Sequence, residues 1–166
     1  MEVEEALLKR RSVRKFTADP VDKEAIDKLL RAAMSGPSAV NKKPWEFYVI
    51  QDPKKIAELN KVGFANYPSP LIIVIAGNQT KFLPSPASDY WIEDVSAATE
   101  NILLEATNLG LGACWCGVYP GKLREKQVAK ILSMPLNYVP FNIIIIGHPD
   151  GAIPEARDQY DEKRKI

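Results

Sequence analysis

Apolar residues recur at helical spacing in five stretches of the chain, and we predict a helix for each. The clearest amphipathic pattern follows Asp22, which suits a helix cap, and stops at Gly36 and Pro37. The longest predicted helix runs from Asp89 to Leu109 and is apolar on more than one side, so we expect it to be buried. The other predicted helices cover residues 2–9, 53–62 and 123–134.

Four stretches between these helices are rich in β-branched and aromatic residues and are predicted to be strands. They cover residues 45–50, 70–76 and 141–149, together with a short strand that begins at Ala113. The stretches "PLIIVIA" and "FNIIII" are apolar without alternation, which is typical of central strands covered on both faces. Residues 77–88 contain glycine, serine and two prolines without periodicity, and are predicted to form a loop.

Helices and strands interleave along the chain, which indicates a single α+β domain over residues 1–166. A layered sandwich and a doubly wound sheet both fit this order of elements. The last stretch, residues 150–166, is polar and has no core-forming period. We therefore expect it to lie on a surface or across a partner.

Composition narrows the classes of function. The 22 basic and 21 acidic residues nearly cancel, so no overall field would draw the protein to nucleic acid. The longest apolar runs are too short to span a bilayer, and the acidic start "MEVEEALL" is unlike a secretory signal. We expect a cytoplasmic protein that binds neither nucleic acid nor membrane.

The histidine and cysteine content argues against a zinc centre. His148, Cys114 and Cys116 are too few for the four ligands of a structural zinc site. We expect the two cysteines to point to opposite faces of an extended segment, which argues against a disulfide between them. His148 follows a strand and fits a loop residue, and a single histidine does not support a Ser/His/Asp grouping.

The stretch "KRRSVRKF", residues 9–16, places five cations around one hydroxyl. This stretch fits a solvated charged turn, a basic segment that binds nucleic acid, or an anion-binding site. Guanidinium groups bind phosphate through paired hydrogen bonds, and Ser12 adds a neutral donor. A phosphate-binding site of this kind requires further ligand-binding residues elsewhere in the chain.

Two further stretches are candidates for these residues. In "SGPSAVNKKPWEF", Ser38 and Asn41 offer side-chain donors and acceptors, although the stretch also fits an ordinary helix-to-strand connection. In "GLGACWCG", Gly112 and Gly117 stand on either side of a short strand, where a flat ligand can approach the backbone. This stretch lacks the strand, glycine and helix order of a dinucleotide-binding fingerprint.

Together and in this order, "RRSVRKF", "PSAVNKKPWEF" and "NILLEATNLGLGACWCGVY", followed by "IIIIGHP" and a tail arginine, resemble the nitroreductase family of FMN-dependent oxidoreductases. The resemblance implies a three-layer α+β sandwich with a mixed central sheet. It also implies an intertwined homodimer with FMN at the subunit interface and residues 150–166 wrapped around the partner. NADH or NADPH would give hydride to flavin N5, and a nitroaromatic, quinone or similar small molecule would accept the electrons. Because the flavin would carry this chemistry, the resemblance assigns no acid, base or nucleophile to the protein.

The same resemblance assigns roles to the motifs. The first would hold the FMN phosphate and ribityl chain, the second would reach the flavin from the other subunit, and the third would present its backbone to the flavin N5 and O4 edge. Arg157 in the tail would return to the phosphate. The residues so assigned are Arg10, Arg11, Ser12 and Arg14, then Pro37, Ser38, Ala39 and Asn41, and then Cys116 and Gly117.

Several alternatives stay open at this point. Lys43 stands where the family commonly has glutamine, so hydrogen bonding near the flavin can differ. Members of the family also remove halogens or fragment the flavin itself, so the fold does not fix the reaction. The chain fits an NAD(P)H oxidoreductase, a flavin carrier without turnover, or an interaction domain whose basic run binds an acidic partner.

Overall fold

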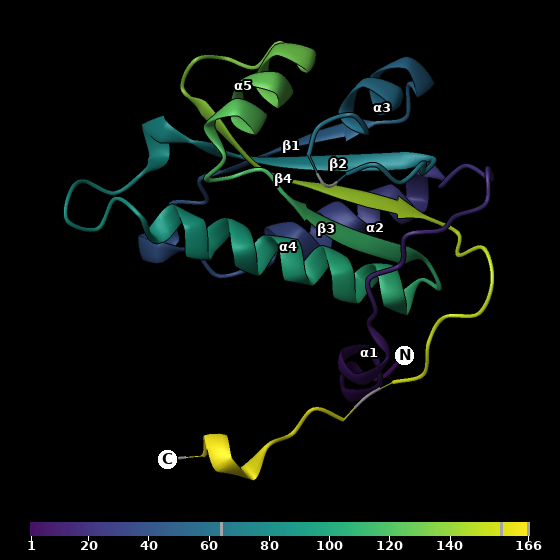
Figure 1. The fold of residues 1–166 in the computed structure, drawn as a ribbon. Coiled ribbons are helices and arrows are strands. Elements are labelled where there is room, and N and C mark those ends of the chain that lie inside the picture. The colour runs from purple at the N-terminus through teal and green to yellow at the C-terminus, as the bar shows by residue number, and fades with distance from the viewer. Residues whose placement is uncertain (64, 157, 166) are drawn as a thin grey trace.

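A four-stranded antiparallel sheet forms the centre of the structure, with helices on both faces (Figure 1). The computed structural model describes residues 1–63, 65–156 and 158–165. The strands lie in the order β1-β2-β4-β3, with β2 and β4 central as their apolar sequences predict. Their bounds are Trp45–Ile50 for β1, Leu71–Asn78 for β2, Gly112–Gly117 for β3 and Tyr138–Gly147 for β4.

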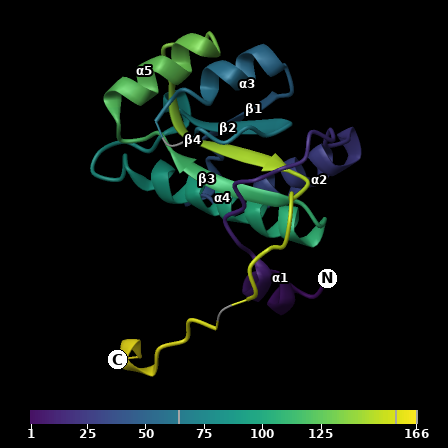
Figure 2. The same ribbon diagram turned by 45° about the vertical axis from the view of Figure 1, so that its right-hand side comes forward.

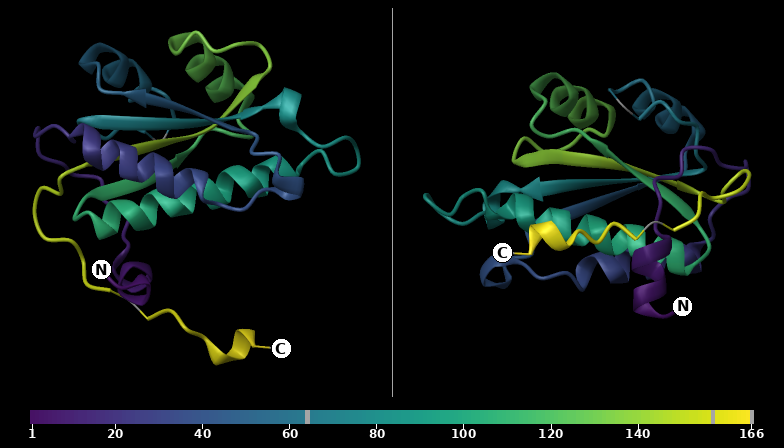
Figure 3. Two further views of the ribbon diagram at one scale, coloured as in Figure 1. Left: turned by 180° about the vertical axis from the view of Figure 1, so that it is seen from behind. Right: turned by 60° about the horizontal axis from the view of Figure 1, so that its bottom comes forward.

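The helices form two further layers. Helices α2 (Lys23–Met34) and α4 (Tyr90–Asn108) run side by side on one face of the sheet (Figure 3, left). Helices α3 (Pro53–Leu59) and α5 (Lys122–Ile131) lie on the other face (Figure 1). The short helix α1 (Val3–Lys9) lies beyond α4, away from the sheet (Figure 2). The predicted three-layer α+β sandwich is confirmed.

Two helices begin at the aspartates that mark their starts in the sequence. The Asp22 carboxylate accepts a 2.7 Å hydrogen bond from the Ala25 N–H at the start of α2. Asp52 caps α3 in the same manner through the Lys54 N–H, and Pro53 occupies the first turn. Each cap satisfies a backbone donor that the helix itself leaves free.

The isoleucine run of β4 serves both faces of the sheet. Ile144 and Ile146 are buried in the core beneath α2 and α4, whereas Ile143 and Ile145 are buried in the core toward α3 and α5. Alternate side chains of a strand point to opposite faces, so a strand covered on both sides needs no polar positions. This explains why "IIII" lacks the alternation of a half-exposed strand.

A bulge interrupts the pairing of β2 with β4. The register passes from Ile75 opposite Asn142 to Ala76 opposite Pro140, which leaves Phe141 as the extra residue. The side chain of Asn142 points toward α4, where its Nδ2 donates a 2.8 Å hydrogen bond to the Thr99 hydroxyl. This hydrogen bond joins the central sheet to α4 next to the bulge.

Two details of the sheet differ from the expectations. The four strands pair antiparallel throughout, and among the described residues the parallel pairing expected of a mixed sheet is limited to an isolated bridge between Ser12 and Ala113. The loop predicted over residues 77–88 begins later, because Gly77 and Asn78 extend β2 alongside the start of β4. The backbone of these two residues pairs with β4, although their side chains show no apolar pattern that would predict a strand.

Residues 150–156 and 158–165 follow β4 as an exposed tail that leaves the sheet and runs past α1 (Figure 2). The tail ends in a short 3-10 helix, Glu162–Arg164. Its predicted role of wrapping a partner subunit stays a prediction. Each helix among the described residues is too short or too polar to cross a membrane.

Candidate functional site

The basic run lies along β3. Ser12 forms the parallel bridge with Ala113, and the N–H of Val13 donates a 3.0 Å hydrogen bond to the Ala113 carbonyl. Val13 packs against Gly112, where an added Cβ would lie 2.6 Å from a Val13 methyl group. The glycine at this position therefore lets the run approach the strand closely.

Ser12 and Arg14 occupy the same side of this extended segment, toward Cys114. The Arg14 guanidinium lies 5.7 Å from the centre of the Tyr67 ring, and its Nη1 donates to the Ser12 carbonyl at 3.4 Å. Both residues are exposed. A hydroxyl and a guanidinium thus face solvent together beside the start of β3, an arrangement suited to an anion.

The other two arginines of the run have protein partners. The Nε of Arg10 lies 3.1 Å from Glu100 Oε1 on α4. The Nε of Arg11 donates a 3.0 Å hydrogen bond to the carbonyl of Glu155 in the tail. One arginine is thereby directed to α4 and the other to the tail. Arg157, expected to return to the phosphate, lies outside the described residues.

Cys114 and Cys116 lie on the same face of β3, so the expectation that they point to opposite faces was wrong. Side chains alternate with a period of two along a strand, and these residues are two positions apart. Both thiols are free and buried in the core toward α3 and α5. The hydrogen bond from Cys116, helped by the nearby Arg14, lowers the pKa of Cys114 to about 6, and the same hydrogen bond raises the pKa of Cys116.

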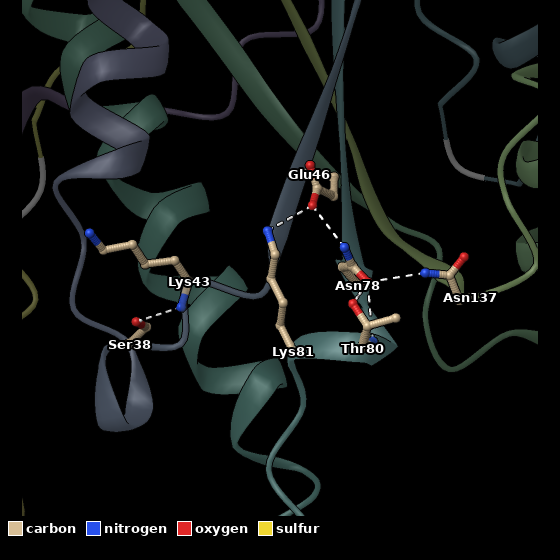
Figure 4. Close-up of polar contacts among 7 residues, drawn as sticks. All are labelled: Ser38, Lys43, Glu46, Asn78, Thr80, Lys81 and Asn137. Atoms are coloured by element: carbon tan, nitrogen blue, oxygen red, sulfur yellow. Dashed lines mark hydrogen bonds and ion pairs between the residues drawn. The ribbon is translucent and has the colours of Figure 1, made fainter.

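The second motif forms a tight turn after α2. Ser38 Oγ accepts a 3.0 Å hydrogen bond from the Lys43 N–H and closes the turn around the 3-10 helix Ala39–Asn41 (Figure 4). The Asp94 carboxylate of α4 accepts a 2.8 Å hydrogen bond from the Ala39 N–H. Burial raises the pKa of Asp94, and this hydrogen bond offsets part of the rise. Of the predicted residues, Pro37 and Asn41 are exposed, and Ser38 and Ala39 are half-buried.

The two motifs meet α4 at separate places. The second motif contacts Asp94, close to the start of the helix, whereas Ser12 bridges Ala113, beyond the end of the helix. The helix rises about 20 Å between Asp94 and its last residue. A single subunit therefore keeps the Ser12–Arg14 pair apart from the Ser38 turn.

A polar cluster that was not predicted from the sequence lies beside this turn (Figure 4). Glu46 of β1 accepts 2.9 Å hydrogen bonds from Asn78 and Lys81, and Asn78 Oδ1 accepts hydrogen bonds from Thr80 and Asn137. Burial alone would raise the pKa of Glu46, but the hydrogen bonds from Asn78 and Lys81 hold it below its usual value. The available signal was the one acid inside the otherwise uncharged strand sequence "WEFYVI".

Gly117 ends β3 at an exposed position. A Cβ built there would meet no protein atom within 4 Å, whereas the neighbouring Cys116 side chain is buried. Because β2 and β3 both pair antiparallel with β4, their last residues, Asn78 and Gly117, reach the same edge of the sheet. The Gly117 backbone is therefore exposed at this edge, and the polar cluster of Glu46 lies along the same edge.

Known proteins resemble this chain over nearly its full length. The model of the nitroreductase family matches residues 7–69 and 63–148. A protein of Methanothermobacter thermautotrophicus named "Putative NADH dehydrogenase/NAD(P)H nitroreductase" is 40% identical over 168 residues, covering 99% of this chain and 85% of the relative.

Solved structures show the same likeness. A protein of Parabacteroides distasonis with the same name superposes with a TM-score of 0.91 at 36% identity, covering 99% of this chain and 96% of the other. An FMN-dependent nitroreductase of Clostridium difficile superposes with a TM-score of 0.86 at 35% identity, covering 97% of this chain and 96% of the other.

Proposed function

Because the chain belongs to the nitroreductase family, we propose that it is an FMN-dependent oxidoreductase that oxidises NADH or NADPH and reduces a small-molecule acceptor. Nitroaromatics and quinones are the acceptor classes that we propose. The observation that carries the proposal is the geometry of β3, which has the exposed Ser12–Arg14 pair beside its start and the open Gly117 backbone at its end.

The residues along β3 fit the chemistry of FMN. A phosphate monoester carries nearly two negative charges near neutral pH and is matched by fixed cationic and hydroxyl donors. Arg14 and Ser12 supply one of each, and Arg10 adds a second guanidinium whose present partner is Glu100. Arg11, bound to the Glu155 carbonyl, would instead hold the tail near the phosphate, where Arg157 would join the site.

The flavin ring would lie toward the other end of β3. When bound, FMN supplies hydride acceptance at N5 and electron release to the acceptor. The missing side chain of Gly117 leaves room for a flat ring against the strand, and a backbone N–H at Cys116 or Gly117 would stabilise negative charge on its edge. The buried Cys116 side chain takes no part in this contact.

The site would be completed by a second copy of the chain. Pro37, Ser38, Ala39 and Asn41 lie on a turn that one subunit keeps apart from its own Ser12–Arg14 pair. We propose that this turn serves the flavin of the partner in a homodimer, as the family resemblance implies. Sedimentation of the FMN-loaded protein tests this step, and a monomer that retains FMN would contradict it.

Steady-state kinetics tests the proposed reaction. The FMN-loaded protein is assayed with NADH or NADPH against a nitroaromatic such as nitrofurazone and a quinone such as menadione, with both substrates varied. Two separate half-reactions predict parallel double-reciprocal lines. A protein that binds FMN but shows no acceptor-dependent oxidation of NADH or NADPH would be a carrier. Consumption of a halogenated phenol in place of both acceptors would indicate reductive dehalogenation.

A further inference from the structure

The turn of the second motif holds an unusual backbone conformation. Val40, Asn41 and Lys43 have φ angles of 52°, 55° and 48°, and none of them is glycine. The left-handed region is unfavourable for residues with a Cβ, most of all for a β-branched residue such as valine. Such conformations persist where the surrounding structure enforces them, and they cluster at ligand-binding sites.

The hydrogen bonds within the turn close it but do not fix its place on the protein. The Asn41 N–H donates to the Ser38 carbonyl at 2.9 Å, and the Lys42 N–H donates to the Ala39 carbonyl at 3.1 Å. Val40 stays 78% exposed, so its side chain gains little from burial. An attachment outside the turn is therefore needed to hold the strained segment in position.

Helix α4 provides that attachment on the amino-terminal side of the strained segment, through two hydrogen bonds. Asp94 accepts the 2.8 Å hydrogen bond from the Ala39 N–H. Two turns along the helix, Asn101 Nδ2 donates a 3.0 Å hydrogen bond to the Ala32 carbonyl near the end of α2. Between them the chain passes close to α4, because a Cβ at Gly36 would lie 3.4 Å from the Ala98 nitrogen.

The use of a carboxylate for this contact is informative. Asp94 is 6% exposed, and burial of an ionisable group is unfavourable unless strong hydrogen bonds compensate. A charged acceptor makes a shorter and stronger hydrogen bond than a neutral one. A buried aspartate is thus a costly anchor, and it fits a place where the position of the Ala39 N–H has to be fixed.

We propose that Asp94 is a positioning residue for the cofactor: through the Ala39 N–H it sets the Ser38–Asn41 turn in the geometry that the flavin of the partner subunit requires. This inference rests on the proposed function, since it concerns the same FMN site. Asp94 acts through the backbone of the turn and does not itself touch the cofactor.

Single variants of the full-length protein test the contact. Asp94→Ala removes the acceptor, and Ala39→Pro removes the donor while suiting the first position of a helix after the extended Ser38. Each is expected to weaken FMN binding about tenfold or more, and the double variant is expected to lose little further. Asp94→Asn, which keeps an acceptor oxygen, should bind FMN within about threefold of wild type. Glu93→Ala is the matched control, because Glu93 is an exposed acid on the same helix.

Mixed dimers separate positioning from general destabilisation. A subunit carrying Asp94→Ala is co-expressed with a subunit carrying Arg14→Ala, and the mixed dimer is isolated through two different affinity tags. If the turn serves the partner, one of the two sites combines an intact basic run with an intact turn, and about half of the wild-type FMN content should return. Both homodimeric variants should stay largely depleted of FMN.

The outcomes distinguish the two proposals. Wild-type protein that fails to bind FMN would overturn the proposed function and this inference with it. Wild-type binding combined with unchanged FMN affinity in Asp94→Ala and Ala39→Pro would overturn the inference alone. Mixed dimers that recover no FMN would show that Asp94 acts within its own subunit, contrary to the proposal. If Asp94→Ala does not fold, Ala39→Pro takes its place in both experiments.

Discussion

Arg10 and Glu100 form an ion pair between the basic run and helix α4, with Arg10 Nε 3.1 Å from Glu100 Oε1. Both side chains are partly exposed, at 33% and 43%. The pair places a carboxylate beside the arginines that we assign to the FMN phosphate. A phosphate that binds Arg10 therefore has to compete with Glu100.

Glu100→Gln should tighten FMN binding. The change removes a negative charge that competes for Arg10, and an exposed pair of this kind limits the gain to at most about fivefold. Riboflavin, which lacks the phosphate, should bind both proteins equally. Fluorescence titration with both ligands measures the effect, and weaker FMN binding in the variant would show that Glu100 orients Arg10 for the phosphate.

Arg14→Ala should weaken FMN binding by roughly ten- to a hundredfold, because a charge-assisted hydrogen bond to the phosphate is lost. The affinity for riboflavin should change far less. Arg31→Ala, at an exposed arginine on α2, is the matched control and should leave both affinities unchanged. Equal losses for FMN and riboflavin would contradict the assignment of Arg14 to the phosphate.

Gly117→Ala should leave the thermal midpoint near that of wild type and weaken FMN binding. The new methyl group meets no protein atom within 4 Å, yet it would occupy the space that we assign to the flavin ring. Gly77→Ala should instead lower the thermal midpoint and leave FMN binding unchanged. Its Cβ would lie 2.4 Å from the Trp91 ring and overpack the core, which should lower the free energy of unfolding by about 1–3 kcal/mol. Undiminished FMN affinity in Gly117→Ala would place the ring elsewhere.

The stability of the protein should depend on pH through Asp94. Burial raises the pKa of this carboxyl in the folded state, whereas the unfolded chain ionises it near pH 3.9. As pH rises through the raised pKa, the folded state has to ionise a buried group, so wild type loses stability relative to Asp94→Asn. Urea unfolding of both proteins without FMN, from acid to neutral pH, should show a growing advantage of the variant, and a constant difference would contradict the raised pKa.

Much of the fold was predictable because its signals are local. Asp22 and Asp52 mark the helix starts that they cap, and the unbroken isoleucine run of β4 marks a strand covered on both faces. The bulge at Phe141 was not predicted, although Pro140 beside it is a signal, because proline within a central strand occurs mainly at bulges.

The motifs of the site could be predicted from the sequence, but the residues that hold these motifs in place could not. The basic run and the "PSAVN" turn stand out by residue type, whereas Asp94 lies 55 residues from Ala39 and reads as one polar position on an apolar helix. Glu100 shows the same limit, since its pairing with Arg10 is set by the packing of α4 against the amino-terminal segment. Contacts between distant segments arise from tertiary packing, and the local pattern of a single sequence does not reveal which residues will meet.

Anaerobic reduction of the purified protein tests the central claim most directly. The absorbance spectrum is recorded after saturation with FMN and removal of the unbound cofactor, and then again after addition of NADH or NADPH without oxygen. The account predicts flavin absorbance that stays with the protein, bleaches on addition of the nicotinamide, and returns when a nitroaromatic or quinone is added. A protein that retains no flavin, or whose bound flavin is reduced by neither nicotinamide, would contradict it.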